Sequence, residues 1–195
     1  MSNQFDHFNG YILAGGKSSR MGTDKGLMLF KGKAIIEYVI EQLQPAVNKV
    51  TIVSNNPEYE KFGFEVIADL IKETGPAGGI YTALNHTDTA LNFIVSCDMP
   101  FISKEAIEFM FQNKGKSQII LPVRQGKMEP LFGIYSKDCL FKWHELMEGA
   151  VIKLQEMVTN FQLNKIEVNN NVQFSDSLFM NINTKKDFEN AFNLI

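Results

Sequence analysis

The sequence predicts an α/β fold in which helices cover both faces of a mostly parallel, twisted sheet, giving three layers. Short apolar runs of strand length alternate along the chain with segments whose apolar residues recur at helical spacing. This alternation is typical of a doubly wound sheet. Polar clusters follow several of the apolar runs, which is where a parallel sheet binds its ligand. At 195 residues, we expect a single domain, residues 1–195, with a substantial core.

The expected strands are short and apolar, and they cover residues 11–14, 49–54, 64–67, 92–96, 118–122, 131–135, 163–168 and 179–182. The expected helices cover residues 34–44, 80–86, 103–113, 137–147, 151–158 and 185–192. In the first helix, Ile36, Val39 and Leu43 share one face, and Pro45 stops the segment. The glycine-rich stretch 75–79 is expected to break the chain before the second helix.

Composition and charge narrow the classes of protein. Hydrophobic residues make up 45% of the chain and charged residues 21%, which suits a soluble globular protein. The formal net charge of −3 argues against nucleic acid as the main partner, because domains that bind it usually carry a basic footprint. No apolar run approaches about 20 residues, so we expect no membrane span.

The cysteines and the N-terminus bear on localisation. Cys97 and Cys139 do not form a disulfide framework, so we expect a cytoplasmic protein. Residues 1–9 have neither the basic region nor the apolar region of a signal peptide. We therefore expect these residues to form a loose leader.

The stretch 11–25 has the character of a phosphate site. The apolar strand 11–14 ends at Gly15-Gly16, and glycines allow positive φ and close approach of a ligand to the main chain. Lys17, Arg20 and Lys25 follow, with hydroxyl side chains between them. Bare amides and cations at the carboxyl end of a strand favour a polyphosphate ligand. The alternative interpretation is an ordinary strand–turn–helix with solvated charges.

Two familiar phosphate loops are excluded. A P-loop needs a glycine five residues before Gly16, and that position is Tyr11. Residues 11–14 are also needed as the strand. The dinucleotide fingerprint Gly-x-Gly-x-x-Gly is absent from this stretch. The loop is therefore of another kind.

Four polar clusters come directly after predicted strands, namely Gly15-Gly16, Ser54-Asn55, Asp69 and residues 97–100. In a parallel sheet these positions share one edge. Asp98 stands out, because Mg²⁺ is usually held by one or two carboxylates together with substrate phosphates. The alternatives are that Asp98 caps the helix near Ser103 or closes a turn with Pro100. We expect Cys97 to be a small buried residue, not a nucleophile, since no histidine adjoins it in sequence.

Residues 13–25, Leu-Ala-Gly-Gly-Lys-Ser-x-Arg-Met-Gly-x-Asp-Lys, resemble the signature of nucleotidyltransferases with the nucleotide-diphospho-sugar transferase (glycosyltransferase-A-like) fold. Among these, the chain is most similar to the molybdenum cofactor guanylyltransferases. Four later segments are similar to further motifs of that family, namely residues 75–80, 97–100, 129–135 and 181–184.

The resemblance implies transfer of GMP from Mg-GTP to molybdopterin, with release of pyrophosphate and formation of molybdopterin guanine dinucleotide. It implies the following nucleotide-binding residues: Leu13, Ala14, Gly15, Gly16, Lys25, Asn55, Asp69, Gly75 and Asp98. Arg20, Lys25 and Asp98 are the implied catalytic residues, with Asp98 also the ligand of Mg²⁺. The asparagine that the family carries after the second strand falls on either Ser54 or Asn55.

The sequence departs from the family in two places that bear on substrates. Ala77 replaces the usual leucine of the Gly-Pro loop. Several members of the family have arginines at the positions of residues 149–153, where the only cationic residue of this sequence is Lys153. A related enzyme with the same loop that uses CTP or a sugar phosphate is one alternative, because pocket geometry sets which base is bound. A nucleotide-binding assembly partner without catalysis is another. Insertion or target enzymes of the cofactor are protein partners consistent with the resemblance.

Overall fold

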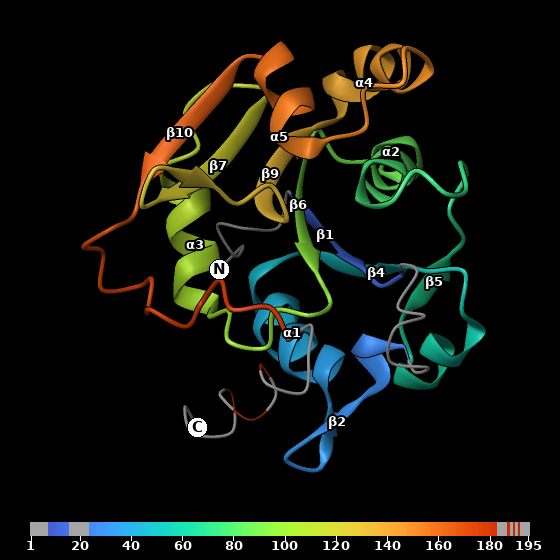
Figure 1. Ribbon diagram of the computed structural model, residues 1–195, viewed down its shortest axis with the longest axis vertical. Helices are drawn as coiled ribbons and strands as arrows, with labels where there is room; N and C mark the ends of the chain where they lie inside the picture. The colour runs from blue at the N-terminus through green and yellow to red at the C-terminus, as the bar shows by residue number, and fades with distance from the viewer. Residues whose placement is uncertain (1–7, 16–23, 183–186, 188, 190, 192–195) are drawn as a thin grey trace.

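The computed structural model describes residues 8–15, 24–182, 187, 189 and 191 (Figure 1). In this part of the chain, one sheet has the strand order β10-β7-β9-β6-β1-β4-β5, and β8 pairs with β7. β1 lies parallel to β4 and β6, β4 to β5, and β7 to β10, whereas β9 runs antiparallel to both of its neighbours. The predicted α/β fold with a mostly parallel sheet is confirmed.

The strands of this sheet are β1 Phe8–Leu13, β4 Lys49–Val53, β5 Glu65–Ile67, β6 Leu91–Ser96, β7 Ile119–Arg124, β8 Lys127–Met128, β9 Phe132–Ser136 and β10 Leu163–Glu167. A separate hairpin consists of β2 Leu29–Phe30 and β3 Lys33–Ala34. The α-helices are α1 Ile35–Leu43, α2 Pro76–His86, α3 Lys104–Gln112, α4 Leu140–Glu148 and α5 Leu154–Met157. The 3₁₀ helices are η1 Lys25–Leu27, η2 Gln44–Ala46, η3 Pro57–Phe62, η4 Lys137–Cys139 and η5 Val158–Asn160.

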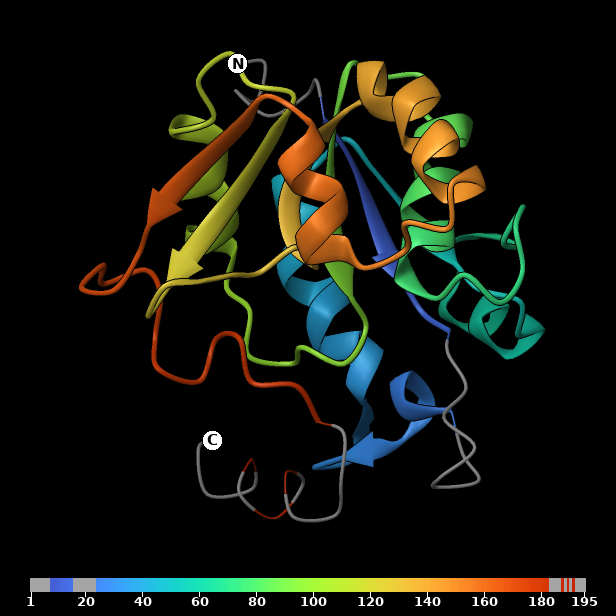
Figure 2. The ribbon, with the colours of Figure 1, turned by 45° about the horizontal axis from the view of Figure 1, so that its top comes forward.

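Helices cover both faces of the sheet, with α1 and α3 on one face and α2, α4 and α5 on the other (Figures 1 and 2). Each face has its own apolar cluster. Because side chains alternate along a strand, Ile12 of β1 packs in the cluster with α1 and α3, whereas Tyr11 and Leu13 pack in the cluster with α2 and α4. The central strands are therefore buried on both sides, which explains their continuous apolar runs.

β1 begins at Phe8, three residues earlier than predicted. The Phe8 ring lies 4.0 Å from the ring of Phe111 on α3, and both Phe8 and Asn9 are buried. The expectation of a loose leader is therefore wrong for Phe8 and Asn9, because a contact with a distant helix orders them. The remainder of the expected leader, residues 1–7, lies outside the described residues.

α2 begins at Pro76, four residues before the predicted start. Gly75 has φ of +60° and precedes Pro76 at the first helical position, where proline is well tolerated. Gly78 lies inside the helix, at a position where the segment before the helix leaves room for a hydrogen but not for a side chain. A Cβ there would lie 2.2 Å from Thr74 Oγ1 and 2.8 Å from the carbonyl oxygen of Ile71. Gly75 thus marks the expected break before the helix, whereas Gly78 lies inside the helix and permits close packing.

The C-terminal third departs most from prediction. Residues 179–182 form no strand, but the Ile182 amide donates a hydrogen bond of 3.0 Å to the carbonyl oxygen of Asp98. The helix predicted over 151–158 is the short α5 followed by η5. Much of the predicted helix 185–192 lies outside the described residues, although Asp187, Glu189 and Ala191 are helical.

Among the described residues, no helix has both the length and the apolar character that crossing a membrane requires.

The packing around Gly78 generates a stability prediction. We expect Gly78→Ala to lower the free energy of unfolding by about 1–3 kcal/mol, because the new methyl group meets a backbone carbonyl. Gly149→Ala is the matched control: its Cβ would meet no atom closer than 3.4 Å, so its effect should stay within about 0.5 kcal/mol. Denaturant unfolding of both variants measures the difference, and equal stabilities would contradict the close approach.

Candidate functional site

Strand register brings the predicted site residues to one edge of the sheet. Leu13 pairs with Val53 of β4 and with Ser96 of β6. The ladder continues past the strands: the Ala14 amide donates to Val53, and the Cys97 amide donates to Leu13, at 2.9 and 3.0 Å. The turns after β1, β4, β5 and β6 therefore emerge side by side at the carboxyl edge.

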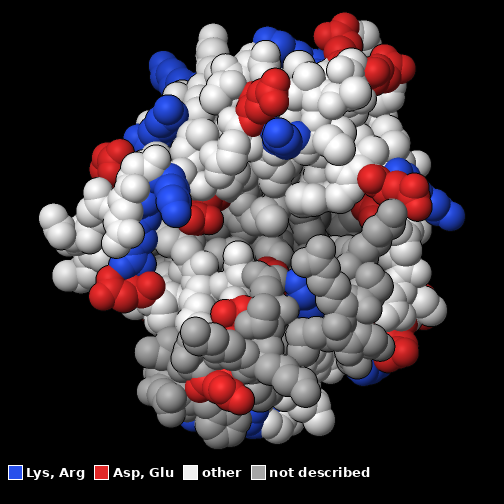
Figure 3. Space-filling view, viewed as in Figure 1, with Lys and Arg blue, Asp and Glu red and all other residues white. Residues whose placement is uncertain are grey.

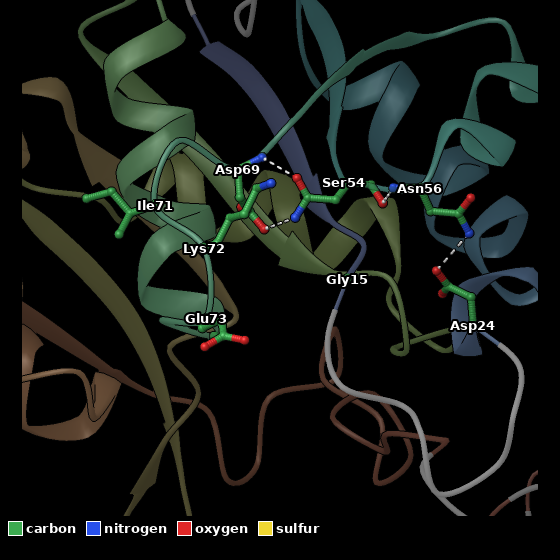
Figure 4. Close-up of a pocket in the computed structure, with 10 residues that line it drawn as sticks. Gly15, Asp24, Ser54, Asn56, Asp69, Ile71, Lys72 and Glu73 are labelled. Atoms are coloured by element: carbon green, nitrogen blue, oxygen red, sulfur yellow. Dashed lines mark hydrogen bonds between the residues drawn. The ribbon is translucent and has the colours of Figure 1, made fainter.

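A cavity of about 630 Å³ opens at this edge (Figure 4). Its walls come from the segments that follow β1, β4 and β5, and from the start of α2. The lining residues are Gly15, Asp24, Ser54, Asn55, Asn56, Asp69, Ile71, Lys72, Glu73 and Gly75. The size is within the range of small-molecule sites.

The cavity brings together four predicted nucleotide-binding residues, namely Gly15, Asn55, Asp69 and Gly75. Leu13 and Ala14 are buried at the end of β1 and do not line it. Lys25 and Asp98 also lie outside its lining. Gly16 and Arg20 fall outside the described residues, so their predicted roles stay predictions.

Asn55 and Asp69 are joined by two hydrogen bonds in the cavity wall. Asn55 Nδ2 donates to Asp69 Oδ2, and the Asp69 amide donates to Asn55 Oδ1, both at 3.2 Å. Ser54 Oγ instead accepts from the amide of Asn56 at 3.1 Å. Of the two candidates after β4, Asn55 is therefore the residue whose side chain contacts Asp69.

The second carboxylate oxygen of Asp69, Oδ1, is buried and has no hydrogen-bond partner among the described residues. Burial raises the pKa of Asp69, and the hydrogen bond from Asn55 lowers it. A buried acceptor without a donor costs stability, and such groups are tolerated where a ligand supplies the donor. Asp69 therefore brings an unmet hydrogen-bond acceptor to the wall of the cavity.

Asp24 is a site residue whose role the sequence did not reveal. Its Oδ1 accepts from Tyr59 Oη at 2.5 Å and from the Gly26 amide at 3.2 Å, and its Oδ2 accepts from Asn56 Nδ2 at 3.3 Å. Asp24 thereby caps η1, which begins at Lys25. An aspartate preceding a short helix is an N-cap signal, but the partners from η3 are visible only in the fold.

Gly26 allows the tyrosine to reach Asp24. A Cβ at Gly26 would lie 2.4 Å from Tyr59 Oη and 3.1 Å from Cys97 Sγ. Burial raises the pKa of the Cys97 thiol, and the carboxylates of Asp98 and Asp24 raise it further. Cys97 is thus a small buried residue, as predicted, and its thiol is held in the protonated form.

Asp98 lies two residues beyond β6, and its Oδ1 accepts a hydrogen bond of 2.6 Å from Ser96 Oγ. It does not cap α3, because Ser103 does so through the Ala106 amide at 3.2 Å. No group of three or more His, Cys, Asp or Glu side chains among the described residues could hold a metal ion. Asp98 is partly exposed, and a single carboxylate of this kind fits a divalent metal ion whose other ligands come from a bound substrate.

Residues 10–161 match the family described as the MobA-like NTP transferase domain, and the chain belongs to that family. The chain is therefore a nucleotidyltransferase. It is 38% identical to the "Probable molybdenum cofactor guanylyltransferase" of Natranaerobius thermophilus, over 95% of each chain. It is 37% identical to the protein of the same description from Flavobacterium johnsoniae, over 85% of this chain and 89% of that one.

Solved structures agree with this assignment. The structure described as molybdopterin-guanine dinucleotide biosynthesis protein A from Archaeoglobus fulgidus superposes with a TM-score of 0.81 at 25% identity, covering 95% of this chain and 97% of the other. A putative protein from Aquifex aeolicus superposes with a TM-score of 0.77 at 30% identity, covering 90% and 93%. The nucleotide-diphospho-sugar transferase fold predicted from the sequence is confirmed.

The contact between Gly26 and Tyr59 generates a coupled prediction. Gly26→Ala should lower the free energy of unfolding by about 1–3 kcal/mol, because the methyl group displaces the tyrosine hydroxyl. Tyr59→Phe should also destabilise, because it removes a hydrogen bond to a charged group. In the double variant the clashing oxygen is absent, so its loss should be smaller than the sum of the two by about 0.5 kcal/mol or more. Denaturant unfolding of all three variants tests this, and strict additivity would contradict it.

Asp69→Asn should separate stability from binding. Because burial raises the Asp69 pKa, its ionised form costs stability above that pKa, and the cost disappears below about pH 4. At pH 7 we expect the nucleotide-free variant to gain roughly 1 kcal/mol, or about 2–4 °C in Tm. Its KM for the nucleotide substrate should rise about ten-fold or more. Asp138→Asn, at an exposed site, is the control. A lower Tm with unchanged KM would refute the assignment.

Proposed function

We propose that the chain transfers GMP from Mg-GTP to molybdopterin, releases pyrophosphate and forms molybdopterin guanine dinucleotide. The observation that carries the proposal is the unpartnered Asp69 oxygen, aligned by Asn55, in a cavity at the same edge as Asp98. The curated relatives named as guanylyltransferases support this substrate. The proposal treats residues 1–195 as one catalytic domain, and the free, buried Cys97 and Cys139 suit the cytoplasm.

Asp69 favours guanine over cytosine. Guanine presents its ring N–H and exocyclic amino group together as neighbouring donors, whereas cytosine presents only an amino donor beside an acceptor. A carboxylate accepts through two oxygens and donates nothing when ionised. With Oδ2 engaged by Asn55 and Oδ1 unpartnered, Asp69 matches a donor edge. This supports GTP as the nucleotide, with CTP as the rival that an assay must exclude.

The phosphates would lie at the glycine turn. The amides after Leu13, together with Lys25 and Arg20, would bind the triphosphate and stabilise charge on the departing pyrophosphate. Asp24 positions Lys25 by capping η1. Mg²⁺ held by Asp98 and the phosphates would polarise the α-phosphate when bound.

The acceptor supplies its own nucleophile, because the phosphate of molybdopterin is already anionic. The protein therefore needs no general base, and its work is to hold two polyanions together in line. No histidine lines the described cavity, which suits this chemistry. Ser96 orients Asp98 through the hydrogen bond of 2.6 Å and so sets where the carboxylate meets the substrate.

A nucleotide panel tests the proposal. The full chain is incubated with molybdopterin, Mg²⁺ and one of GTP, CTP or ATP, and pyrophosphate and the dinucleotide product are both measured. We expect product with GTP alone. Product with CTP alone would replace the guanylyl assignment, and saturable GTP binding without pyrophosphate release would indicate a non-catalytic partner.

Asp98→Ala should lower turnover by about 100-fold or more, since charge stabilisation at a reacting phosphate is a large catalytic contribution. The fold should persist, because the hydrogen bond to Ile182 uses the backbone carbonyl of residue 98. Ser96→Ala is the graded comparison: it removes the orienting hydrogen bond but keeps the carboxylate, so its loss should be smaller. Steady-state kinetics with GTP measure both, and a rate near wild type in Asp98→Ala would refute the metal role.

A further inference from the structure

A second cavity, of about 590 Å³, opens where β7 and β10 end. Its walls include Val123, Lys127, Met128, Glu129, Gln155 and Lys165. β7 is antiparallel to β9, and β9 is antiparallel to β6, so β7 and β10 run in the direction of β6. The second cavity is therefore on the same edge of the sheet as the first, beyond the end of β6. The proposed nucleotide site uses none of its lining residues.

A short turn connects this cavity to Asp98. The Leu131 carbonyl accepts from the Ser96 amide at 3.1 Å, and the Glu129 carbonyl accepts from the Phe132 amide at 3.1 Å. The buried Tyr135 hydroxyl donates to the Pro130 carbonyl at 2.6 Å. The turn that carries Glu129 is thus fixed to the strand that leads to Asp98. Figure 3 shows the face hollowed at its centre, with charged side chains around the hollow.

The charges in this cavity do not neutralise one another. Glu129 is half-buried, and burial raises its pKa while Lys127 lowers it. Among the described residues, its carboxylate has neither a hydrogen bond nor an ion pair within 4.0 Å, and the same holds for the ammonium groups of Lys127 and Lys165. By contrast, Lys49 and Glu65 close to 3.0 Å elsewhere on the surface. Opposite charges held apart around one cavity suit a ligand that carries both donors and anionic groups.

We infer that this cavity binds the acceptor through a 2-amino-4-oxopyrimidine edge, with Glu129 accepting from its amino group and ring N–H, and with Lys127 and Lys165 contacting its anionic groups. This rests on the proposed function, in which the acceptor is a pterin that carries a phosphate. A carboxylate matches two neighbouring donors, as Asp69 does in the first cavity. Guanine shares the same edge, so the experiment must separate a pterin from a second guanine nucleotide.

α5 contacts the hairpin formed by β7 and β8 and helps to hold it in place. Gln155 Nε2 donates a hydrogen bond of 2.9 Å to the Met128 carbonyl, which joins β8 to the helix beside it. Val123 and Met128 give the cavity an apolar wall against which a planar heterocycle can lie. The cavity thus offers an apolar wall, two ammonium groups and two carboxylates, of which Glu167 already accepts a hydrogen bond of 3.2 Å from Asn169 whereas Glu129 accepts none from the described residues.

The test uses steady-state kinetics with molybdopterin and GTP. Glu129→Gln should raise the KM for molybdopterin roughly ten-fold or more, because it removes a charge-assisted pair of hydrogen bonds. The KM for GTP should stay within two-fold, which also shows that the variant folds. Lys165→Ala should raise the molybdopterin KM several-fold. Glu156→Gln removes the same charge at an exposed position of α5 outside the cavity, and it is the matched control.

A binding assay, which does not depend on turnover, shows whether the cavity binds a pterin or a guanine nucleotide. The probe is the fluorescent anion pterin-6-carboxylate, titrated with wild-type protein and with Glu129→Gln, and then challenged with GMP. We expect binding that depends on Glu129 and resists GMP. Displacement of the probe by GMP, or a molybdopterin KM in Glu129→Gln within two-fold of wild type, would overturn the inference. Pterin binding that depends on Glu129 without any dinucleotide product would instead overturn the proposed function and leave the site standing.

Discussion

The parallel pairing of β1 with β4 on one side and β6 on the other is the constraint on which the site depends. Parallel strands end at one edge, so residues separated by more than 80 positions in sequence, such as Gly15 and Asp98, follow neighbouring strands. The pairing is itself fixed by burial, because each central strand has apolar side chains on both faces. A slip of one residue would expose one of these faces to the wrong neighbours. Core packing therefore sets the geometry of the chemistry.

Strand register brings the turns to one edge of the sheet, and hydrogen bonds between the turns then fix the positions of their polar side chains. Asp24 joins the start of η1 to η3 through Tyr59 and Asn56, and Asn55 aligns Asp69. Farther along the edge, the Ser96 amide joins the end of β6 to the turn that follows β8. Each link connects segments that approach the same edge from different strands. The positions of the polar groups are therefore fixed relative to one another before a ligand binds, which is the preorganisation that the proposed transfer between two anions requires.

The same edge carries two cavities whose chemistry is related. Both present a carboxylate that lacks a full set of donors, Asp69 in one and Glu129 in the other, and burial raises both pKa values. Between them lies the end of β6 with Asp98. An enzyme that joins a guanine nucleotide to a pterin must recognise two heterocycles that present the same pair of donors, an amino group and a ring N–H. Under the proposed function, the two carboxylates lie on either side of the transfer centre and meet that requirement.

The sequence alone predicted most of the strands and helices of the main sheet, its parallel character and much of the edge, because hydrophobic periodicity and turn residues are local signals. Gly15, Asn55, Asp69 and Gly75 line one cavity, as strand-end logic and family resemblance implied together. Tertiary structure decided what depends on distant contacts. Phe8 joins β1 because its ring packs against Phe111. Position 78 in α2 is a glycine because Thr74 and the carbonyl of Ile71 leave no room for a Cβ. Residues 179–182 form no strand, although Ile182 donates a hydrogen bond to the Asp98 carbonyl, and Asp24 gains its role through Tyr59. These partners are far apart in the chain, and no local pattern encodes which side chains will meet once the sheet has formed.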